Sequence, residues 1–473
     1  MPIKDIPINV GLNLAVDEVG LKTHNAAMHD CFVDELGGVN RRPGLVEFCD
    51  LGTSSPVDGI FWWGYYSYLI AVSGGLAFKV TASDGSIFSQ LTGSVFTPGN
   101  RVIFGDWDSS WFAADGGNIV KGDTTSVGEI SDVDAPANIS HIAVLDRYLL
   151  AGQTNSRRVW YPQVNDPDDW QAEYFSKDAQ FDKLQATRVA GLEAYLIGER
   201  SMEVWHNDGS TPFVRLGQGF VQSGTVAPYS FVYCDAVSSF VWLDHERKVV
   251  MLNGRTPAVL SATMTKYIQS FSYVTDALGD YMVLAGRPYY KIDFPTEDKT
   301  LIWDFIKEQW YEWGYWNSGS ASYERWRGNC YCLAPAWNFS LVGDKSNGKI
   351  YKVDPTVFTD DGDTIRMLNR TGHVDWDAPG TKKKSVALNL RLKRTQVATP
   401  PGPVQMVIQY RDNGATTWKT EKTITISTTA ADTEYRASIR QLGAYYSRQW
   451  QFIYTDPNVG CSLVQAQEEF EYL

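Results

Sequence analysis

One pattern recurs seven times along the chain and constrains its fold more than any other feature. Each copy has an aromatic residue, then several apolar or small residues, then a polar or glycine-containing turn. The seven runs are Tyr68–Val72, Trp111–Asp115, Tyr148–Gly152, Tyr195–Glu199, Phe240–Asp244, Tyr281–Ala285 and Phe339–Gly343. Their starting positions are 43, 37, 47, 45, 41 and 58 residues apart. A four-stranded propeller blade takes about 40–45 residues, so this spacing is typical of a propeller.

A second strand-like run follows each of the seven after a polar turn. These runs are Leu76–Val80, Asn118–Lys121, Arg158–Trp160, Met202–Trp205, Val249–Leu252, Tyr289–Ile292 and Lys349–Val353. Gly74-Gly75, Gly116-Gly117, Asn155-Ser156 and Asn347-Gly348 are residues that tight hairpin turns favour. In the long last interval, Leu301–Phe305 and Trp310–Trp313 indicate an outer hairpin of a blade plus a loop insertion. We therefore predict a β-propeller of about seven blades; the alternative is an irregular all-β protein.

A turn-rich acidic segment, Asp360–Thr364, precedes a change of pattern. After it, Val386–Leu392, Val404–Tyr410, Thr423–Ser427 and Trp450–Tyr454 alternate apolar and polar residues, which is typical of an antiparallel β-sandwich. Residues 1–50 show little periodicity before Leu45. The predicted organisation is an N-terminal arm that closes the propeller (1–50), the β-propeller (51–364) and the β-sandwich (365–473). The 13% aromatic content and 40 glycines also favour short strands over long helices.

The charge of the chain is divided unevenly between these parts. The formal net charge is −13, which argues against a free-standing nucleic-acid binder. Residues 365–473 carry +4 and the remainder −17. The one cationic cluster is a candidate partner-docking surface, for an acidic partner or for nucleic-acid phosphates, although its pattern favours a plainer alternative. It comprises Lys382, Lys383, Lys384, Arg391, Lys393 and Arg394. The alternative is a solvated strand edge on which lysines prevent unwanted pairing.

No sequence motif for catalysis or cofactor binding stands out. The chain has no G-x-S-x-G, no H-E-x-x-H and no phosphate-binding Walker loop. His24, His29, Cys31 and Cys49 lack the paired spacing of a zinc site. We expect no catalytic residues, cofactor or metal, and cysteines that are reduced. We also expect no signal peptide and no membrane span, because the uncharged segment Gly59–Phe78 is split by Ser73-Gly74-Gly75 like a hairpin.

One turn approximates the Asp-box hairpin of sialidase propellers, D-x-G-x-T-W. It runs from Asp412 to Trp418 and has one residue too many. We expect Asn413-Gly414 to form the turn, Asp412 to bond turn amides and Trp418 to pack against the sheet. The motif occurs once, in the sandwich, so we interpret it as structural.

Several segments resemble the packaged-DNA stabilisation proteins of short-tailed bacteriophages, also called tail accessory, hub or nozzle proteins. They are Met1–Ile8, Asn40–Leu45, Tyr195–Trp205, and Val249–Gly254 with Pro257–Ser261. Arg440–Trp450 resembles a strand–turn motif common in the sandwiches of phage neck and tail proteins. The likeness covers most of the chain in order, although each piece is short.

The resemblance implies a non-enzymatic virion protein of the phage tail, made in the host bacterial cytoplasm. Such proteins form a ring of six copies below the portal and its adaptor, the head–tail connector. The ring extends the DNA channel, helps retain packaged double-stranded DNA until genome ejection, and supports a needle or plug and tail fibres or spikes. An acidic channel wall would let DNA pass without sequence-specific binding.

Two other functions stay open at this level. The Asp-box likeness and 17 tryptophans suit a tail-associated propeller hydrolase or lectin that acts on host surface glycans. The third hypothesis is a cytoplasmic scaffold protein with a propeller fold that is unrelated to viruses. This hypothesis predicts that the protein is a monomer.

Overall fold

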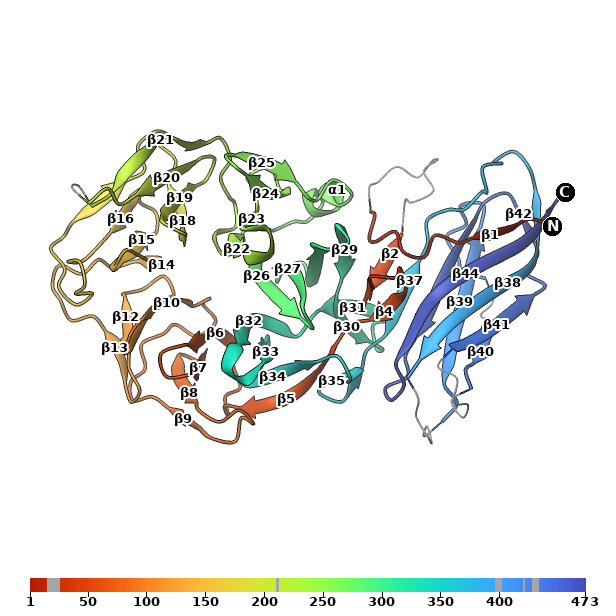
Figure 1. Ribbon diagram of the computed structural model, residues 1–473, viewed down its shortest axis with the longest axis horizontal. Helices are drawn as coiled ribbons and strands as arrows, with labels where there is room; N and C mark the ends of the chain where they lie inside the picture. The colour runs from red at the N-terminus through yellow and green to blue at the C-terminus, as the bar shows by residue number, and fades with distance from the viewer. Residues whose placement is uncertain (15–25, 210–211, 396–401, 420–421, 428–433) are drawn as a thin grey trace.

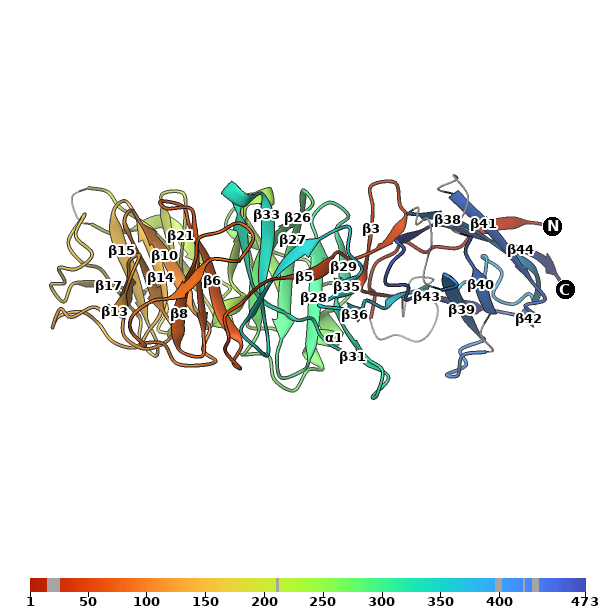
Figure 2. The ribbon, with the colours of Figure 1, turned by 90° about the horizontal axis from the view of Figure 1, so that it is seen from below.

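The computed structural model describes the whole chain except residues 15–25, 210–211, 396–401, 420–421 and 428–433. A propeller and a sandwich lie side by side along the long axis, and both termini lie at the sandwich end (Figure 1). In the view from below, the strands of the blades run across that axis (Figure 2). None of the helices in the described part of the chain is long and apolar enough to cross a membrane.

The propeller consists of seven four-stranded antiparallel blades within the described ranges, which confirms the predicted fold. Blade 1 contains β6 (Val57–Trp63), β7 (Tyr68–Ser73), β8 (Leu76–Val80) and β9 (Phe88–Gln90). Blade 2 contains β10 (Ile103–Trp107), β11 (Ser110–Ala114), β12 (Val120–Gly122) and β13 (Val127–Glu129). Blade 3 contains β14 (Ile139–Leu145), β15 (Tyr148–Gln153), β16 (Arg158–Trp160) and β17 (Tyr174–Ser176). Blade 4 contains β18 (Leu184–Ala190), β19 (Glu193–Gly198), β20 (Met202–His206) and β21 (Val214–Val221).

The remaining blades adjoin the short helix α1 (Thr265–Gln269) and the sandwich. Blade 5 contains β22 (Val232–Cys234), β23 (Ser239–Leu243), β24 (Val249–Asn253) and β25 (Thr256–Val259). Blade 6 contains β26 (Leu278–Leu284), β27 (Arg287–Phe294), β28 (Lys299–Asp304) and β29 (Gln309–Glu312), followed by the inserted hairpin β30 (Gly314–Asn317) and β31 (Ser322–Arg325). Blade 7 contains β32 (Gly328–Ala334), β33 (Phe339–Asp344), β34 (Lys349–Asp354) and, from the N-terminal region, β5 (Gly44–Asp50).

The blades close into a ring because each buries apolar residues against the next. A hydrophobic cluster lies between each pair of neighbouring blades from 1 to 6, and another lies between blades 7 and 1. The cluster between blades 6 and 7 is continuous with the core of the sandwich. β5 completes blade 7 through antiparallel pairing with β34, so residues from both ends of the propeller share one sheet. The short strands β35 (Thr359–Asp360) and β36 (Asp363–Thr364) lie along the other edge of β5.

The sandwich packs two sheets around a core that continues into the interface of blades 6 and 7. The first contains β3 (Cys31–Val33), β4 (Val39–Arg41), β44 (Cys461–Tyr472), β38 (Lys383–Arg394) and β41 (Glu434–Arg440), with β1 (Ile3–Asp5) and β42 (Ala444–Tyr445) alongside. The second contains β2 (Ala27–His29), β37 (Met367–Arg370), β43 (Arg448–Tyr454), β39 (Gln405–Asp412) and β40 (Lys422–Thr425). β2 also pairs in parallel with β29, so the second sheet is continuous with blade 6. The boundaries proposed at residues 50 and 364 stay predictions.

Candidate functional site at the propeller–sandwich junction

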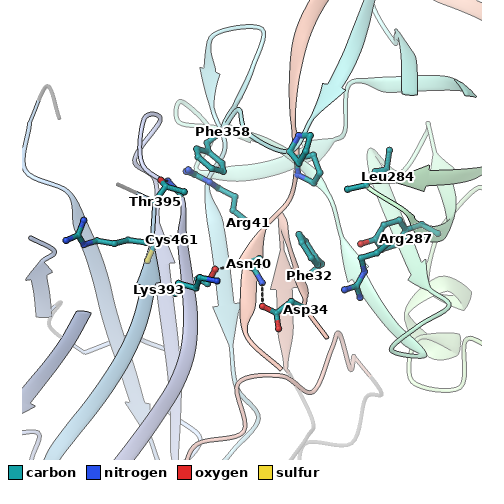
Figure 3. Close-up of a pocket in the computed structure, with 17 residues that line it drawn as sticks. Phe32, Asp34, Asn40, Arg41, Leu284, Arg287, Phe358, Lys393, Thr395 and Cys461 are labelled. Atoms are coloured by element: carbon teal, nitrogen blue, oxygen red, sulfur yellow. Dashed lines mark hydrogen bonds between the residues drawn. The ribbon is translucent and has the colours of Figure 1, made fainter. Parts of the chain in front are cut away.

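A cleft of about 290 Å³ separates blade 6 from the first sheet of the sandwich. Figure 3 shows its walls: Leu284 and Arg287 lie on the propeller side, and Lys393, Thr395 and Cys461 lie on the sandwich side. The hairpin of β3 and β4 runs between them. The residues of this hairpin and those that follow it up to Gly44 determine how the propeller and the sandwich are joined.

Asp34 shapes the turn of this hairpin. Its carboxylate accepts hydrogen bonds from the amides of Leu36 (2.9 Å) and Gly38 (2.8 Å) and from Asn40 Nδ2 (2.8 Å). Gly37 has a φ of 89°, a left-handed conformation that glycine adopts without strain. Asn40 Oδ1 in turn accepts from the hydroxyl of Ser462 on β44, which fixes the hairpin to the sandwich.

Arg41 points into the sandwich, where carbonyl oxygens rather than carboxylates receive its hydrogen bonds. Its guanidinium donates to the carbonyl oxygens of Asp456 (2.6 Å) and Val459 (3.1 Å). The rings of Phe358 and Tyr454 lie 4.4 and 5.1 Å from it. Burial lowers the pKa of Arg41 to about 10, so it remains a cation at neutral pH. Its packing on two aromatic faces stabilises that charge.

Arg42 turns the opposite way and joins two buried carboxylates. Its Nε donates to Asp30 (2.6 Å), and its terminal nitrogens donate to Asp360 at 2.9 and 2.5 Å. A further hydrogen bond reaches the carbonyl of Gly314 at the start of β30 (2.8 Å). Burial raises the pKa of Asp30 to about 6, although Arg42 opposes this shift. Burial alone would lower the pKa of Arg42, but Asp30 and Asp360 raise it above its usual value.

Position 44 requires glycine because the surrounding backbone leaves no room for a side chain. A Cβ at this position would lie 2.4 Å from the carbonyl oxygen of Thr359 and 2.6 Å from that of Val357. The amide of Gly44 also donates to the Val357 carbonyl at 2.9 Å. The segment Asn40–Gly44 therefore connects the sandwich, the loop before β35 and blade 7 within five residues.

The propeller contacts the opposite side of the same hairpin. Arg287 donates to the carbonyl of Val33 (2.8 Å) and to Asp304 (2.5 Å). The Tyr311 hydroxyl accepts from the amide of Val33 (3.2 Å). These contacts come from β27, β28 and β29, so blade 6 holds β3 through several strands.

The six predicted docking residues divide into two groups. The exposed ones are Lys382, Lys384, Arg391 and Lys393, and the buried ones are Lys383 and Arg394. The Lys383 ammonium donates to the carbonyls of Ala378 (2.5 Å) and Tyr446 (2.8 Å). Two β-bulges shift the register of β38 against β44, and a bulge reverses which residues face the core. Of the six, Lys393 and Arg394 line the cleft.

The lining of the cleft is cationic, with Arg41, Arg287, Lys393 and Arg394 facing Asp34 alone among carboxylates. No histidine or serine–base pair lies among its described lining residues. The thiol of Cys461 is buried, and burial raises its pKa to about 12. Such a cleft can hold an anionic or aromatic group, but it offers no nucleophile activated for covalent chemistry.

The other residues that the sequence analysis singled out have structural roles. All six cysteines are buried and free of disulfides. Within the described ranges no three His, Cys, Asp or Glu side chains are placed to hold a metal ion; His24 lies outside those ranges. Asn413 and Gly414 have φ values of 55° and 75°, which confirms the predicted turn. Asp412, however, accepts from Arg448 at 2.7 and 3.1 Å, so its expected role with turn amides is replaced by a buried ion pair.

Sequence reasoning did not single out Arg41, Arg42, Asp30 or Asp360 for this junction. The two adjacent arginines before Pro43-Gly44 drew attention only because they belong to a segment that carries the family resemblance. Their acceptors lie on distant segments of the chain, which no local pattern reveals.

The chain matches the family profile Phage_stabilise, described as "Bacteriophage P22 Gp10, beta-propeller", over residues 48–358. No curated protein matches it in sequence. Solved structures similar to it include the WD40 β-propeller domain of Doa1, at 10% identity and TM-score 0.38, covering 63% of this chain and 94% of that one.

Two further solved structures are similar to the chain at comparable levels. The extracellular domain of the putative hybrid two-component system BT4673 from B. thetaiotaomicron has 9% identity and TM-score 0.41, covering 92% and 60% of the two chains. PorZ of Porphyromonas gingivalis has 10% identity and TM-score 0.37, covering 72% and 44%. The profile match spans more than half of the chain, so the chain belongs to the P22 Gp10 family of phage-stabilisation proteins, which are β-propeller proteins of the phage tail.

Proposed function

We propose that the chain is a non-enzymatic structural protein of a short-tailed phage tail, with six copies forming a ring below the portal adaptor. Its family membership carries this proposal. The junction supports it, because two adjacent arginines tie propeller and sandwich together through buried contacts. A stable ring needs subunits whose domains keep a fixed relative orientation. A buried, well-packed interface between the domains limits their relative motion.

The ring would extend the DNA channel, help retain the packaged genome and anchor the needle or plug and the fibres or spikes. Six copies would carry a formal charge of about −78, and an acidic wall repels DNA phosphates. In this proposal DNA passes without sequence-specific contacts. Residues 51–364, together with β5, would supply the propeller platform, and residues 365–473, together with β1 to β4, the sandwich.

The exposed cations on β38 and directly before it are the proposed docking residues for the adaptor. They are Lys382, Lys384, Arg391 and Lys393. Arg391 already pairs with Glu434 at 2.8 Å, and Lys384 lies 4.0 Å from Glu471, so Lys382 and Lys393 offer the charges that are most available to a partner. Lys383 and Arg394 are buried and serve the fold.

Imaging of the full chain mixed with its portal–adaptor complex tests this function. We expect a sixfold ring below the adaptor, and loss of binding in Lys382→Gln/Lys384→Gln/Lys393→Gln. The matched control, Arg147→Gln/Lys183→Gln/Arg200→Gln, removes three exposed charges from the propeller and should still bind. A monomer that ignores the adaptor would contradict the proposal. So would robust release of sugars from host envelope material, which would favour the glycan hydrolase.

A further inference from the structure

Three arginines stack on tryptophans at one face of the second sandwich sheet, away from the junction cleft. We call the set Arg366, Arg370, Arg411, Trp316 and Trp418 the guanidinium face. Arg366 lies 3.9 Å from the ring centre of Trp316. Arg370 and Arg411 lie 5.2 and 4.9 Å from the ring centre of Trp418. All five side chains are half-buried.

Strand register brings Arg370 and Arg411 to one side of the sheet. Arg370 on β37 lies opposite Gln451 on β43, which lies opposite Gln409 on β39. Arg411 lies two residues beyond Gln409, and side chains two apart on a strand share a face. Trp450 and Phe452, the neighbours of Gln451, face the sandwich core on the other side.

The hydrogen bonds of the three guanidiniums go to neutral acceptors. Arg370 Nε donates to Gln451 (2.9 Å), Arg411 Nε to Gln449 (2.6 Å), and Arg366 to the Tyr323 hydroxyl (2.8 Å). Among the described side chains, no carboxylate lies within 4.0 Å of any of the three. Other arginines of this chain, such as Arg42 and Arg448, have such carboxylates.

The positive charges of this face also act on one another. Burial, with the nearby Arg411 and Arg366, lowers the pKa of Arg370 to about 10. Burial likewise lowers the pKa of Arg411. Close, uncompensated cations are unfavourable for folding alone, and an anion placed between them would relieve this repulsion.

We propose that the guanidinium face docks an acidic segment of another protein, whose carboxylates pair with Arg366, Arg370 and Arg411. Guanidinium groups held flat by stacking present their remaining N–H donors in the geometry that carboxylates match. Nucleic acid fits less well, because the arginines occupy the ring faces on which bases would stack.

This docking surface lies beyond the proposed adaptor contact on β38, and its test is separate from the ring experiment. The ring could form while the guanidinium face stays empty. Equally, the face could bind carboxylates in a chain that never joins a tail.

Fluorescence polarisation of a labelled poly-glutamate peptide with the full chain tests the inference. We expect salt-sensitive binding that falls about tenfold or more in Arg366→Gln/Arg370→Gln/Arg411→Gln, since three charge contacts are lost. The control Arg391→Gln/Lys393→Gln/Arg436→Gln removes equal charge from the first sheet and should bind as the unaltered chain does. The single variant Arg411→Gln, expected to bind severalfold more weakly, serves if the triple variant does not fold.

Several outcomes would overturn the docking of an acidic protein. Equal weakening in the two triple variants would show non-specific charge attraction. Tighter binding of duplex DNA than of poly-glutamate through the same arginines would identify a nucleic-acid surface. Self-association of the unaltered chain that the same variant abolishes would identify a second copy as the occupant.

Discussion

Arg42 and Asp360 lie 318 positions apart in the sequence, yet two hydrogen bonds of 2.9 and 2.5 Å join them. Both side chains are almost fully buried, with 1% and 2% of their surface exposed. Asp30 completes the arrangement at 2.6 Å. The chain entering the first blade is therefore tied to the chain leaving the last one.

Replacing Arg42 with methionine should destabilise the protein strongly. The substitution keeps most of the side-chain volume but leaves Asp30 and Asp360 buried without a counter-charge. Breaking a buried ion pair in this way costs about 3–5 kcal/mol. Urea unfolding followed by tryptophan fluorescence measures the free energy of unfolding of Arg42→Met against the unaltered chain.

Arg391→Met is the matched control, because Arg391 is 47% exposed in its pair with Glu434. Loss of an exposed pair should lower the free energy of unfolding far less than loss of the buried one. Equal losses in the two variants would contradict a special role for the buried cluster.

Gly44→Ala should also weaken the protein, for a steric reason. The new methyl group would meet two carbonyl oxygens, of Thr359 and Val357, at 2.4 and 2.6 Å. Overpacking against backbone costs about 1–3 kcal/mol. Gly380→Ala adds the same methyl group where no atom lies within 4 Å, and thermal unfolding should separate the two variants by several degrees. A Gly44→Ala variant as stable as Gly380→Ala would be inconsistent with the close approach.

Asp58, at the start of β6, predicts a pH dependence of stability. Burial raises its pKa from 3.8 to about 6, against the hydrogen bond from the amide of Gly99. The folded chain therefore holds a proton that the unfolded chain releases between about pH 4 and 6. The stabilisation from this proton is present at pH 4 and is lost as the pH rises through 6.

Asp58→Asn removes this titration while keeping the shape of the side chain. Between pH 4 and pH 7 the unaltered chain should lose about 1–3 kcal/mol of stability relative to the variant. Urea unfolding at several pH values gives the difference between the two curves. Parallel curves would show that Asp58 ionises in the folded chain as it does in the unfolded one.

The repeated hairpins predicted the propeller because buried strand pairs need apolar residues at regular intervals. Six of the seven aromatic runs lie on the second strand of a blade. The run at Tyr281 instead lies on β26, the first strand of blade 6, and Ala285-Gly286 forms the turn that follows. The first strand of blade 6 carries the same pattern that the second strands of the other blades carry. The pattern alone therefore could not tell which strand of the blade the run at Tyr281 forms.

The candidate site was much harder to predict. Lys383 and Arg394 belong to a run of charges that looks exposed. Both are buried because the inward-facing positions of β38 change from odd to even residue numbers at a bulge near Val386. Arg42 is among the most polar residues of the chain, yet it is buried because Asp30 and Asp360 meet it there. Contacts between such distant segments follow from the closed ring and not from any local pattern.

The thiol of Cys49 on β5 reports whether the N-terminal strand stays paired in blade 7. Burial raises its pKa to about 11, and its side chain packs in the cluster between blades 7 and 1. Only exposed thiolates react quickly with disulfide reagents. Native chain treated with such a reagent at pH 8 should leave Cys49 unlabelled, whereas denatured chain should label all six cysteines. Mass spectrometry of peptides measures each site.

Cys234 on blade 5 is the internal control, because it is buried in a sheet that does not contain β5. In Gly44→Ala, labelling of Cys49 should speed up more than labelling of Cys234, since the strain falls at the start of β5. Rapid labelling of Cys49 in the unaltered chain would mean that β5 leaves the blade readily. The ring closure would then depend on the other six blades and not on this strand.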